Sequence, residues 1–173
     1  MKHLEKDKLQ SLLDIIGSNP SLQIAHFTKE SSLLTQMLSE YCNQREYLYQ
    51  INCTDLVSFG EMKKNIKNNK NIQIKNIPLE RKAYMIQGKQ YDFLFVTTPI
   101  ENDMKSDFLR KAHTIICNAG NIIIFINKRN KEERYHWITL LEEHDYVATS
   151  TIDDLFEEYD IIISKKMHGW GSK

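Results

Sequence analysis

The sequence has few cysteines, and they are far apart. Only Cys42, Cys53 and Cys117 occur in 173 residues. An odd number of cysteines without paired spacing argues against a disulfide framework and a zinc site, and is typical of the reducing cytosol. The histidines include no pair at metal-ligand spacing; they are His3, His26, His113, His136, His144 and His168. We therefore predict no bound metal and a cytoplasmic location.

The chain also lacks an excess of charge of either sign. Lys and Arg together number 23, as do Asp and Glu, so the net charge is zero. Such a balance gives no overall field that would attract a polyanionic partner. The two signs are nevertheless separated along the chain. Residues 62–90 hold eight bases and one acid, whereas residues 142–160 hold eight acids and no base. We predict a bipolar surface.

Long apolar runs, repeats and long linkers are absent from the sequence. No run approaches the roughly 20 apolar residues that span a membrane. The N-terminus has the pattern of a charged helix rather than of a signal peptide, so we predict no membrane partner. A chain of 173 residues is long enough for one domain with a buried core. We predict a single domain over residues 1–173, with an N-terminal helix in residues 1–20 and the core in residues 21–173.

Short apolar runs alternate with segments of helical periodicity. This alternation predicts an α/β fold with a largely parallel sheet that helices cover on both faces. The apolar runs predict seven strands, over Leu22–Phe27, Tyr47–Ile51, Ile72–Ile77, Tyr91–Thr97, Ile122–Ile126, Tyr146–Ile152 and Tyr159–Ser164.

Helix signals stand between these runs. They predict an opening helix that Gly17 and Pro20 end, a helix capped by Thr28 with Glu30 in its first turn, a helix over Phe59–Ile66, a helix from Asp107 closed by a left-handed Gly120, and a helix over Arg134–His144. Residues 79–90 fit two alternatives. One is a short helix, and the other pairs Ala83–Gln87 with the next strand through a turn at Gly88-Lys89.

The second half of the chain carries a recognisable pattern. The phrase Phe-Leu-x-x-Ala-x-x-Ile-x-x-x-Ala-Gly spans residues 108–120 and precedes the buried run Ile122–Ile126. A helix and two further strands follow, the strands joined by a short acidic loop. This half resembles the class I S-adenosylmethionine-dependent methyltransferases. The resemblance implies a Rossmann-like methyltransferase fold, with a seven-stranded, mostly parallel sheet in the order 3-2-1-4-5-7-6. The short loop also favours an antiparallel last strand, because it leaves no room for a crossover helix.

The resemblance further implies a cofactor site beyond the carboxyl ends of the strands, near the switch between the first and fourth strands. The family holds the methionine moiety with a glycine-rich turn, the ribose with an acid, and the adenine with a further acid. The matching positions in this sequence are His26, Phe27, Thr28 and Lys29 in the first turn, Asn52 with Asp55 nearby at the ribose, Asn76 at the adenine, and Thr97, Thr98 and Pro99 facing the methyl acceptor.

These positions depart from the family pattern. The first turn has no glycine, so side chains occupy space that the family leaves open. Asn52 replaces an acid and lacks the charge that roughly doubles the strength of a hydrogen bond. We therefore predict a divergent site that binds S-adenosylmethionine weakly or not at all. No catalytic residue is identified, and His26 fits either a packing residue or a catalytic base.

Three functions remain open at this point. One is a methyltransferase-like protein with a degenerate cofactor site and residual methyl transfer to an unknown acceptor. Another is a non-catalytic scaffold that binds through its bipolar surface, and a third is a nucleotide-binding protein of different chemistry. The lysines of the basic stretch fit either a solvated face or a nucleic-acid contact with Tyr84 available to stack on a base; they include Lys63, Lys64, Lys67 and Lys70. The two charged stretches together also favour self-association.

Overall fold

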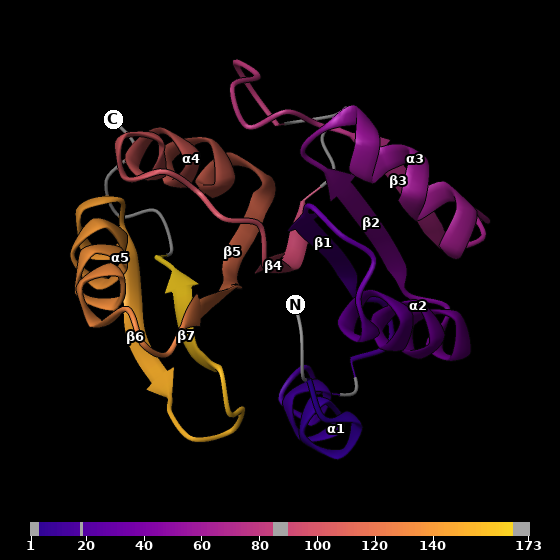
Figure 1. The fold of residues 1–173 in the computed structure, drawn as a ribbon, viewed down its shortest axis with the longest axis horizontal. Coiled ribbons are helices and arrows are strands. Elements are labelled where there is room, and N and C mark those ends of the chain that lie inside the picture. Colours follow the sequence, from indigo (N-terminus) through magenta and orange to yellow (C-terminus); the bar gives the residue numbers. More distant parts are fainter. Residues whose placement is uncertain (1–3, 18, 85–89, 168–173) are drawn as a thin grey trace.

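A computed structural model describes residues 4–17, 19–84 and 90–167 of the chain. Helices and strands alternate from residue 6 to residue 76 (Figure 1). The strands are β1 (Gln23–Thr28), β2 (Leu48–Cys53), β3 (Ile72–Asn76), β4 (Tyr91–Val96), β5 (Ile116–Asn127), β6 (Tyr146–Ile152) and β7 (Tyr159–Lys166). The helices are α1 (Lys6–Asp14), α2 (Leu33–Arg45), α3 (Leu56–Asn65), α4 (Asn102–Ile115) and α5 (Lys131–Glu143).

The seven strands form one sheet in the order β3-β2-β1-β4-β5-β7-β6. The pairs from β3 across to β5 are parallel, whereas β7 is antiparallel to both of its neighbours. This confirms the predicted order and the antiparallel insertion of the last strand. The carboxyl ends of β1, β4 and β5 therefore meet at one edge of the sheet, where ligands bind in folds of this kind.

Each face of the sheet carries its own apolar cluster. On one face Leu34 and Leu38 of α2 and Met62 of α3 pack against residues such as Ile51 of β2. On the other face the apolar sides of α4 and α5 cover the sheet, and Figure 1 shows these two helices together on the side away from α2 and α3. The run Ile122–Ile126 in β5 lies between the clusters and is buried throughout, as its continuous apolar pattern predicted.

The predicted helix cap at Thr28 is wrong. Thr28 is the last residue of β1, and α2 begins at Leu33 with Ser32 as its N-cap. The Ser32 N–H donates to Thr35 Oγ1 at 2.9 Å. Thr28 Oγ1 instead donates to the Glu30 carbonyl oxygen at 2.9 Å and accepts from the Glu30 N–H at 3.2 Å. Thr28 therefore stabilises the turn after β1 rather than a helix.

Gly120 does not close α4, contrary to the prediction. The helix ends at Ile115, β5 begins at once, and Gly120 lies within that strand. Here β5 advances from residue 116 to 121 while β4 advances only from 91 to 93, so β5 bulges. Ala119 adopts the left-handed conformation in the bulge, with φ of 64°. Glycine is needed at position 120 because a Cβ there would lie 2.9 Å from the Cys117 carbonyl oxygen and 3.1 Å from that of Asp92.

The structure decides in part between the two alternatives for residues 79–90. Residues 79–84 form turns and bends, so the short helix is not found there, and β4 begins at Tyr91. The alternative pairing over 83–87 lies mostly outside the described residues. Among the described residues no helix is long and apolar enough to span a membrane. The same ranges contain no cluster of three or more His, Cys, Asp or Glu side chains that could hold a metal ion.

Substituting alanine for glycine tests the bulge. We expect Gly120→Ala to destabilise the protein by about 1–3 kcal/mol, because the added methyl group overpacks against two backbone carbonyls. Gly60→Ala is the matched control, since a Cβ at this exposed position of α3 meets nothing within 4 Å. It should stabilise the protein by about 0.5–1 kcal/mol through helix propensity. Urea unfolding measures both changes, and an unchanged stability in Gly120→Ala would contradict the tight bulge.

Candidate functional site

A cavity of about 400 Å³ lies at the carboxyl ends of β1, β4 and β5. Its wall combines apolar side chains with polar and charged ones in similar proportion. It is lined by Lys29, Glu30, Thr97, Thr98, Pro99, Ile100, Ile124, Phe125, Ile126, Asn127, Glu133, Trp137 and Tyr159. We call this cavity the edge cleft. Four of the predicted site residues line it, namely Lys29 after β1 and Thr97, Thr98 and Pro99 after β4.

Phe27 does not face the edge cleft. Its side chain is fully buried, and its ring lies 4.8 Å from the ring of Tyr84 and 5.4 Å from that of Phe108. Tyr84 belongs to the irregular segment 77–84, and its hydroxyl donates to the Leu79 carbonyl oxygen at 2.7 Å. Where the resembling family places a glycine turn, this chain therefore packs an aromatic cluster.

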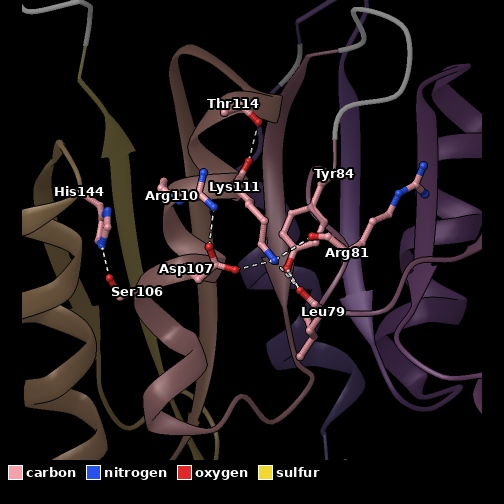
Figure 2. A network of polar contacts seen from close by, with 9 residues as sticks. All are labelled: Leu79, Arg81, Tyr84, Ser106, Asp107, Arg110, Lys111, Thr114 and His144. Atoms are coloured by element: carbon pink, nitrogen blue, oxygen red, sulfur yellow. Dashed lines mark hydrogen bonds and ion pairs between the residues drawn. The ribbon is translucent and has the colours of Figure 1, made fainter.

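The segment 77–84 is held against the sheet by Lys111 of α4 (Figure 2). This lysine is only 3% exposed. Its ammonium group donates to the carbonyl oxygens of Leu79 at 2.6 Å and Arg81 at 2.9 Å, and pairs with Asp107 at 2.7 Å. It also lies 4.7 Å from the centre of the Tyr84 ring, within reach of a cation–π contact. The aromatic cluster beside Phe27 is thus fixed by a buried charge that sequence patterns did not reveal.

Asn52 lies at the end of β2, as predicted, but its side chain is turned into the protein. The residue is 1% exposed, and its Oδ1 accepts a hydrogen bond from Gln50 Nε2 at 2.8 Å. Gln50 Oε1 in turn accepts from the Tyr91 hydroxyl at 2.8 Å, and burial raises the pKa of Tyr91 to about 12. The amide oxygen predicted to hold a ribose is therefore already bonded within the core.

Asp55 and Asn76 also lie away from the edge cleft. Asp55 caps α3, where its carboxylate accepts from the Ser58 N–H at 2.7 Å, and this bond lowers its pKa. Asn76 ends β3, and its Oδ1 is buried without a hydrogen-bond partner among the described residues. One contact connects the end of β2 to the edge cleft, between the hydroxyls of Thr54 and Thr98 at 3.4 Å. The ten predicted residues thus divide into a group at the cleft and a group engaged elsewhere.

His26 connects the interior to the edge cleft. Its Nδ1 lies 2.7 Å from the Tyr49 hydroxyl, and its Nε2 lies 2.7 Å from Thr97 Oγ1. The ring is fully buried, and this burial lowers its pKa to about 3. A charged imidazolium at this position is therefore disfavoured. Sequence patterns did not indicate Tyr49 as a partner, because strand aromatics at buried positions are usually core residues.

A second cavity, of about 530 Å³, shares Ile100 and Glu133 with the edge cleft. Lys105 of α4 lines this cavity although it is only 1% exposed overall. Its ammonium group donates to Asn102 Oδ1 at 2.7 Å and lies 3.4 Å from Glu133, whose carboxylate balances its charge. The Trp137 ring centre is 5.1 Å away. Sequence patterns did not single out this lysine, because it precedes Asp107, where the predicted helix begins, whereas α4 begins at Asn102.

The basic stretch is exposed, but one of its proposed contacts is wrong. The four lysines on and after α3 all lie at the surface; they are Lys63, Lys64, Lys67 and Lys70. Lys70 approaches Glu46 at 3.7 Å, and both side chains remain largely in solvent. Tyr84, predicted as a stacking platform for a base, is buried in the aromatic cluster and does not reach the surface.

Comparison with known proteins bears on the fold. No protein-family model matches the chain, and no curated protein matches it either. Solved structures do match along most of its length. An S-adenosylmethionine-dependent O-methyltransferase from Thermotoga maritima aligns with a TM-score of 0.74 at 9% identity, covering 99% of this chain and 69% of that one. The N-methyltransferase NodS from Bradyrhizobium japonicum, in complex with S-adenosylhomocysteine, aligns with a TM-score of 0.71 at 10% identity, covering 95% and 88%.

A methyltransferase structure from Thermoplasma acidophilum, described as putative in function, gives a TM-score of 0.67 at 13% identity and covers 90% of this chain and 72% of that one. Likeness at these identities concerns the path of the chain rather than its chemistry. The strand order, the antiparallel β7 and these alignments agree. The chain has the Rossmann-like fold of the class I S-adenosylmethionine-dependent methyltransferases.

Proposed function

We propose that this chain is a methyltransferase-like protein with a degenerate cofactor site, which binds S-adenosylmethionine weakly or not at all. The observation that carries the proposal is the state of Asn52, which is buried and bonded to Gln50. A ribose would have to break that bond and expose an amide from the core. Phe27 adds to the argument, since its ring is packed where a cofactor turn needs open backbone. These residues do not fit the cofactor, and we derive no methyl-transfer step through it.

Calorimetry with S-adenosylmethionine and S-adenosylhomocysteine tests this proposal. An acid-to-amide change at the ribose position weakens binding by about 1–3 kcal/mol, or about ten- to hundredfold, before any steric effect of Phe27 is added. We expect no measurable heat at micromolar ligand and no rise in the thermal midpoint, which any ligand of the native state would produce. NodS, whose structure contains S-adenosylhomocysteine, serves as the positive control.

Micromolar binding that Asn52→Ala weakens would show that the site survives, and the proposal would be wrong. Asn65→Ala is the matched control, because Asn65 is exposed at the end of α3. Binding that both variants leave unchanged would equally contradict the proposal and would place the cofactor away from β2.

A second candidate is a non-catalytic module that binds nucleic acid, or a second copy of itself, through its charges. The exposed lysines on and after α3 favour it, because phosphate neutralisation requires several bases acting together. We expect RNA to be retarded in a gel at low salt and released by Lys64→Glu/Lys67→Glu. The control is Lys6→Glu/Lys131→Glu, which changes the net charge equally at exposed lysines elsewhere. Equal retardation by both double variants would argue against a specific basic face, and light scattering in low and high salt measures self-association.

A further inference from the structure

A buried polar chain ends at the edge cleft. It runs from the Tyr49 hydroxyl through the two ring nitrogens of His26 to the Thr97 hydroxyl, with both links at 2.7 Å. Tyr49 and His26 are completely buried, whereas Thr97 is partly exposed and lines the cleft. These two hydrogen bonds therefore connect the buried Tyr49 hydroxyl to the Thr97 hydroxyl in the wall of the edge cleft.

The directions of these hydrogen bonds follow from counting donors and acceptors. Burial keeps His26 neutral, so one ring nitrogen carries a hydrogen and the other accepts. The Tyr49 hydroxyl makes no other hydrogen bond within the described residues, so its hydrogen must go to His26 Nδ1. The reverse tautomer would leave a buried phenol hydrogen without an acceptor, at a cost of about 1–3 kcal/mol. His26 therefore carries its hydrogen on Nε2 and donates to Thr97 Oγ1.

The hydrogen of the Thr97 hydroxyl is then left over. Within the described residues, the acceptor that this hydroxyl can reach is the Phe27 carbonyl oxygen, at 3.5 Å from Thr97 Oγ1. That oxygen already accepts the N–H groups of Thr97 at 3.1 Å and Thr98 at 3.2 Å. Both of its lone pairs are in use. With Oγ1 occupied from behind by His26, the Thr97 hydroxyl has its hydrogen available for an acceptor inside the cleft.

The rest of the cleft indicates what kind of molecule would carry that acceptor. Ile100, Ile124 and Trp137 give it an apolar wall. Lys29 and Glu30 at the margin carry opposite charges, and Glu133 is balanced by Lys105. An apolar surface with a small number of placed polar groups, whose charges are offset by neighbours of opposite sign, matches the usual composition of small-molecule sites.

We propose that the edge cleft binds an uncharged, largely apolar small molecule through its carbonyl oxygen, which accepts a hydrogen bond from Thr97. His26 and Tyr49 are positioning residues, since they fix the direction of the Thr97 hydroxyl without touching the ligand. This site goes beyond the proposed function and does not depend on whether S-adenosylmethionine binds.

The experiment uses acetophenone and ethylbenzene as probes, because they differ mainly in the carbonyl oxygen. Titrations are followed by ¹H–¹⁵N NMR of the full chain. We expect acetophenone to shift the backbone amides of Thr97 and Thr98 and the indole of Trp137, and to bind about tenfold more tightly than ethylbenzene. Thr97→Val should bring acetophenone to the level of ethylbenzene, whereas Thr97→Ser should retain the preference.

The hydrogen-bonded chain from Tyr49 to Thr97 can also be tested directly, through the position of the His26 ring hydrogen. Long-range ¹H–¹⁵N NMR of the free protein should find the His26 hydrogen on Nε2, and Tyr49→Phe should produce a mixture of tautomers and reduce the preference for acetophenone. Equal affinity for the two probes, no shift at Thr97 with acetophenone, unchanged binding in Thr97→Val, or a hydrogen on Nδ1 in the wild type would each overturn the proposal. Failure of S-adenosylmethionine to bind has no bearing on these outcomes.

Discussion

Ile124→Asp is expected to leave no folded domain at 25 °C. Ile124 is 1% exposed and stands in β5 between Val96 of β4 and Ile162 of β7. Although Ile124 forms part of the edge-cleft wall, a carboxylate at this almost fully buried position would lose nearly all of its hydration, which costs several kcal/mol even after relaxation. The lost packing of a buried isoleucine adds about 2–5 kcal/mol. The sum is comparable to the total stability of a domain, about 5–15 kcal/mol.

Circular dichroism and solubility measure this effect. Ile124→Val should cost only about 0.5–1.5 kcal/mol, because it removes one methyl group and buries no charge. Asn127→Asp is the second control, since it introduces the same carboxylate at the exposed end of the same strand. A soluble Ile124→Asp protein with the thermal midpoint of the wild type would contradict the central position of β5.

Lys111→Met is expected to destabilise the protein by about 2–4 kcal/mol. Methionine keeps most of the apolar stem but removes the donor to the carbonyl oxygens of Leu79 and Arg81 (Figure 2). Leaving buried acceptors without a donor costs about 1–3 kcal/mol each, and Leu79 retains its bond from Tyr84. The loss should be concentrated in segment 77–84, where hydrogen exchange would rise first.

Neighbouring substitutions separate this buried donor from ordinary surface charge. Arg110→Met and Asp107→Asn should each change stability by less than about 1 kcal/mol, because both side chains are more than half exposed. The pH dependence gives a second readout. Hydrogen bonds from Lys111 and then Arg110 lower the pKa of Asp107. Its contribution is therefore present above the ordinary Asp pKa and lost as the pH falls through the lowered value, and Lys111→Met should reduce that acid-side loss. A Lys111→Met protein as stable as the wild type would contradict the role of Lys111 in holding segment 77–84 against the sheet.

Much of the fold could be predicted because its signals are local or cumulative. The apolar run Ile122–Ile126 identifies a strand buried on both faces, and the short acidic loop before Tyr159 excludes a parallel return. The ends of helices and strands were harder to predict. Gly120 has the composition of a helix cap, but the close approach of the Asp92 carbonyl in β4 places it in a strand bulge instead. That part of the constraint comes from a residue 28 positions earlier, and no local pattern encodes it.

The location of the candidate site could be predicted from the sequence, but the contacts of its side chains could not. The chain after β1 and β4 does form a cavity wall at Lys29 and Thr97, as strand topology requires. What the side chains do there depends on partners distant in sequence. The Asn52 amide is bonded to Gln50, which is itself held by Tyr91, 41 residues away. The Thr97 hydroxyl is bonded to His26, 71 residues away. A hydrogen bond between such positions leaves no periodic trace in the sequence.

The insertion of β7 between β5 and β6 has a consequence for biosynthesis. When the ribosome has released β5 and β6, the strand that belongs between them has not yet been made. Until then Ile122–Ile126 presents an open strand edge, the kind of surface that pairs with other chains. Formation of a hairpin takes about 1–10 μs, much less than the synthesis of the roughly 14 residues from 153 to 166 at about 5–20 residues per second. Translation speed, rather than strand pairing, therefore sets how long the nascent chain is exposed to aggregation.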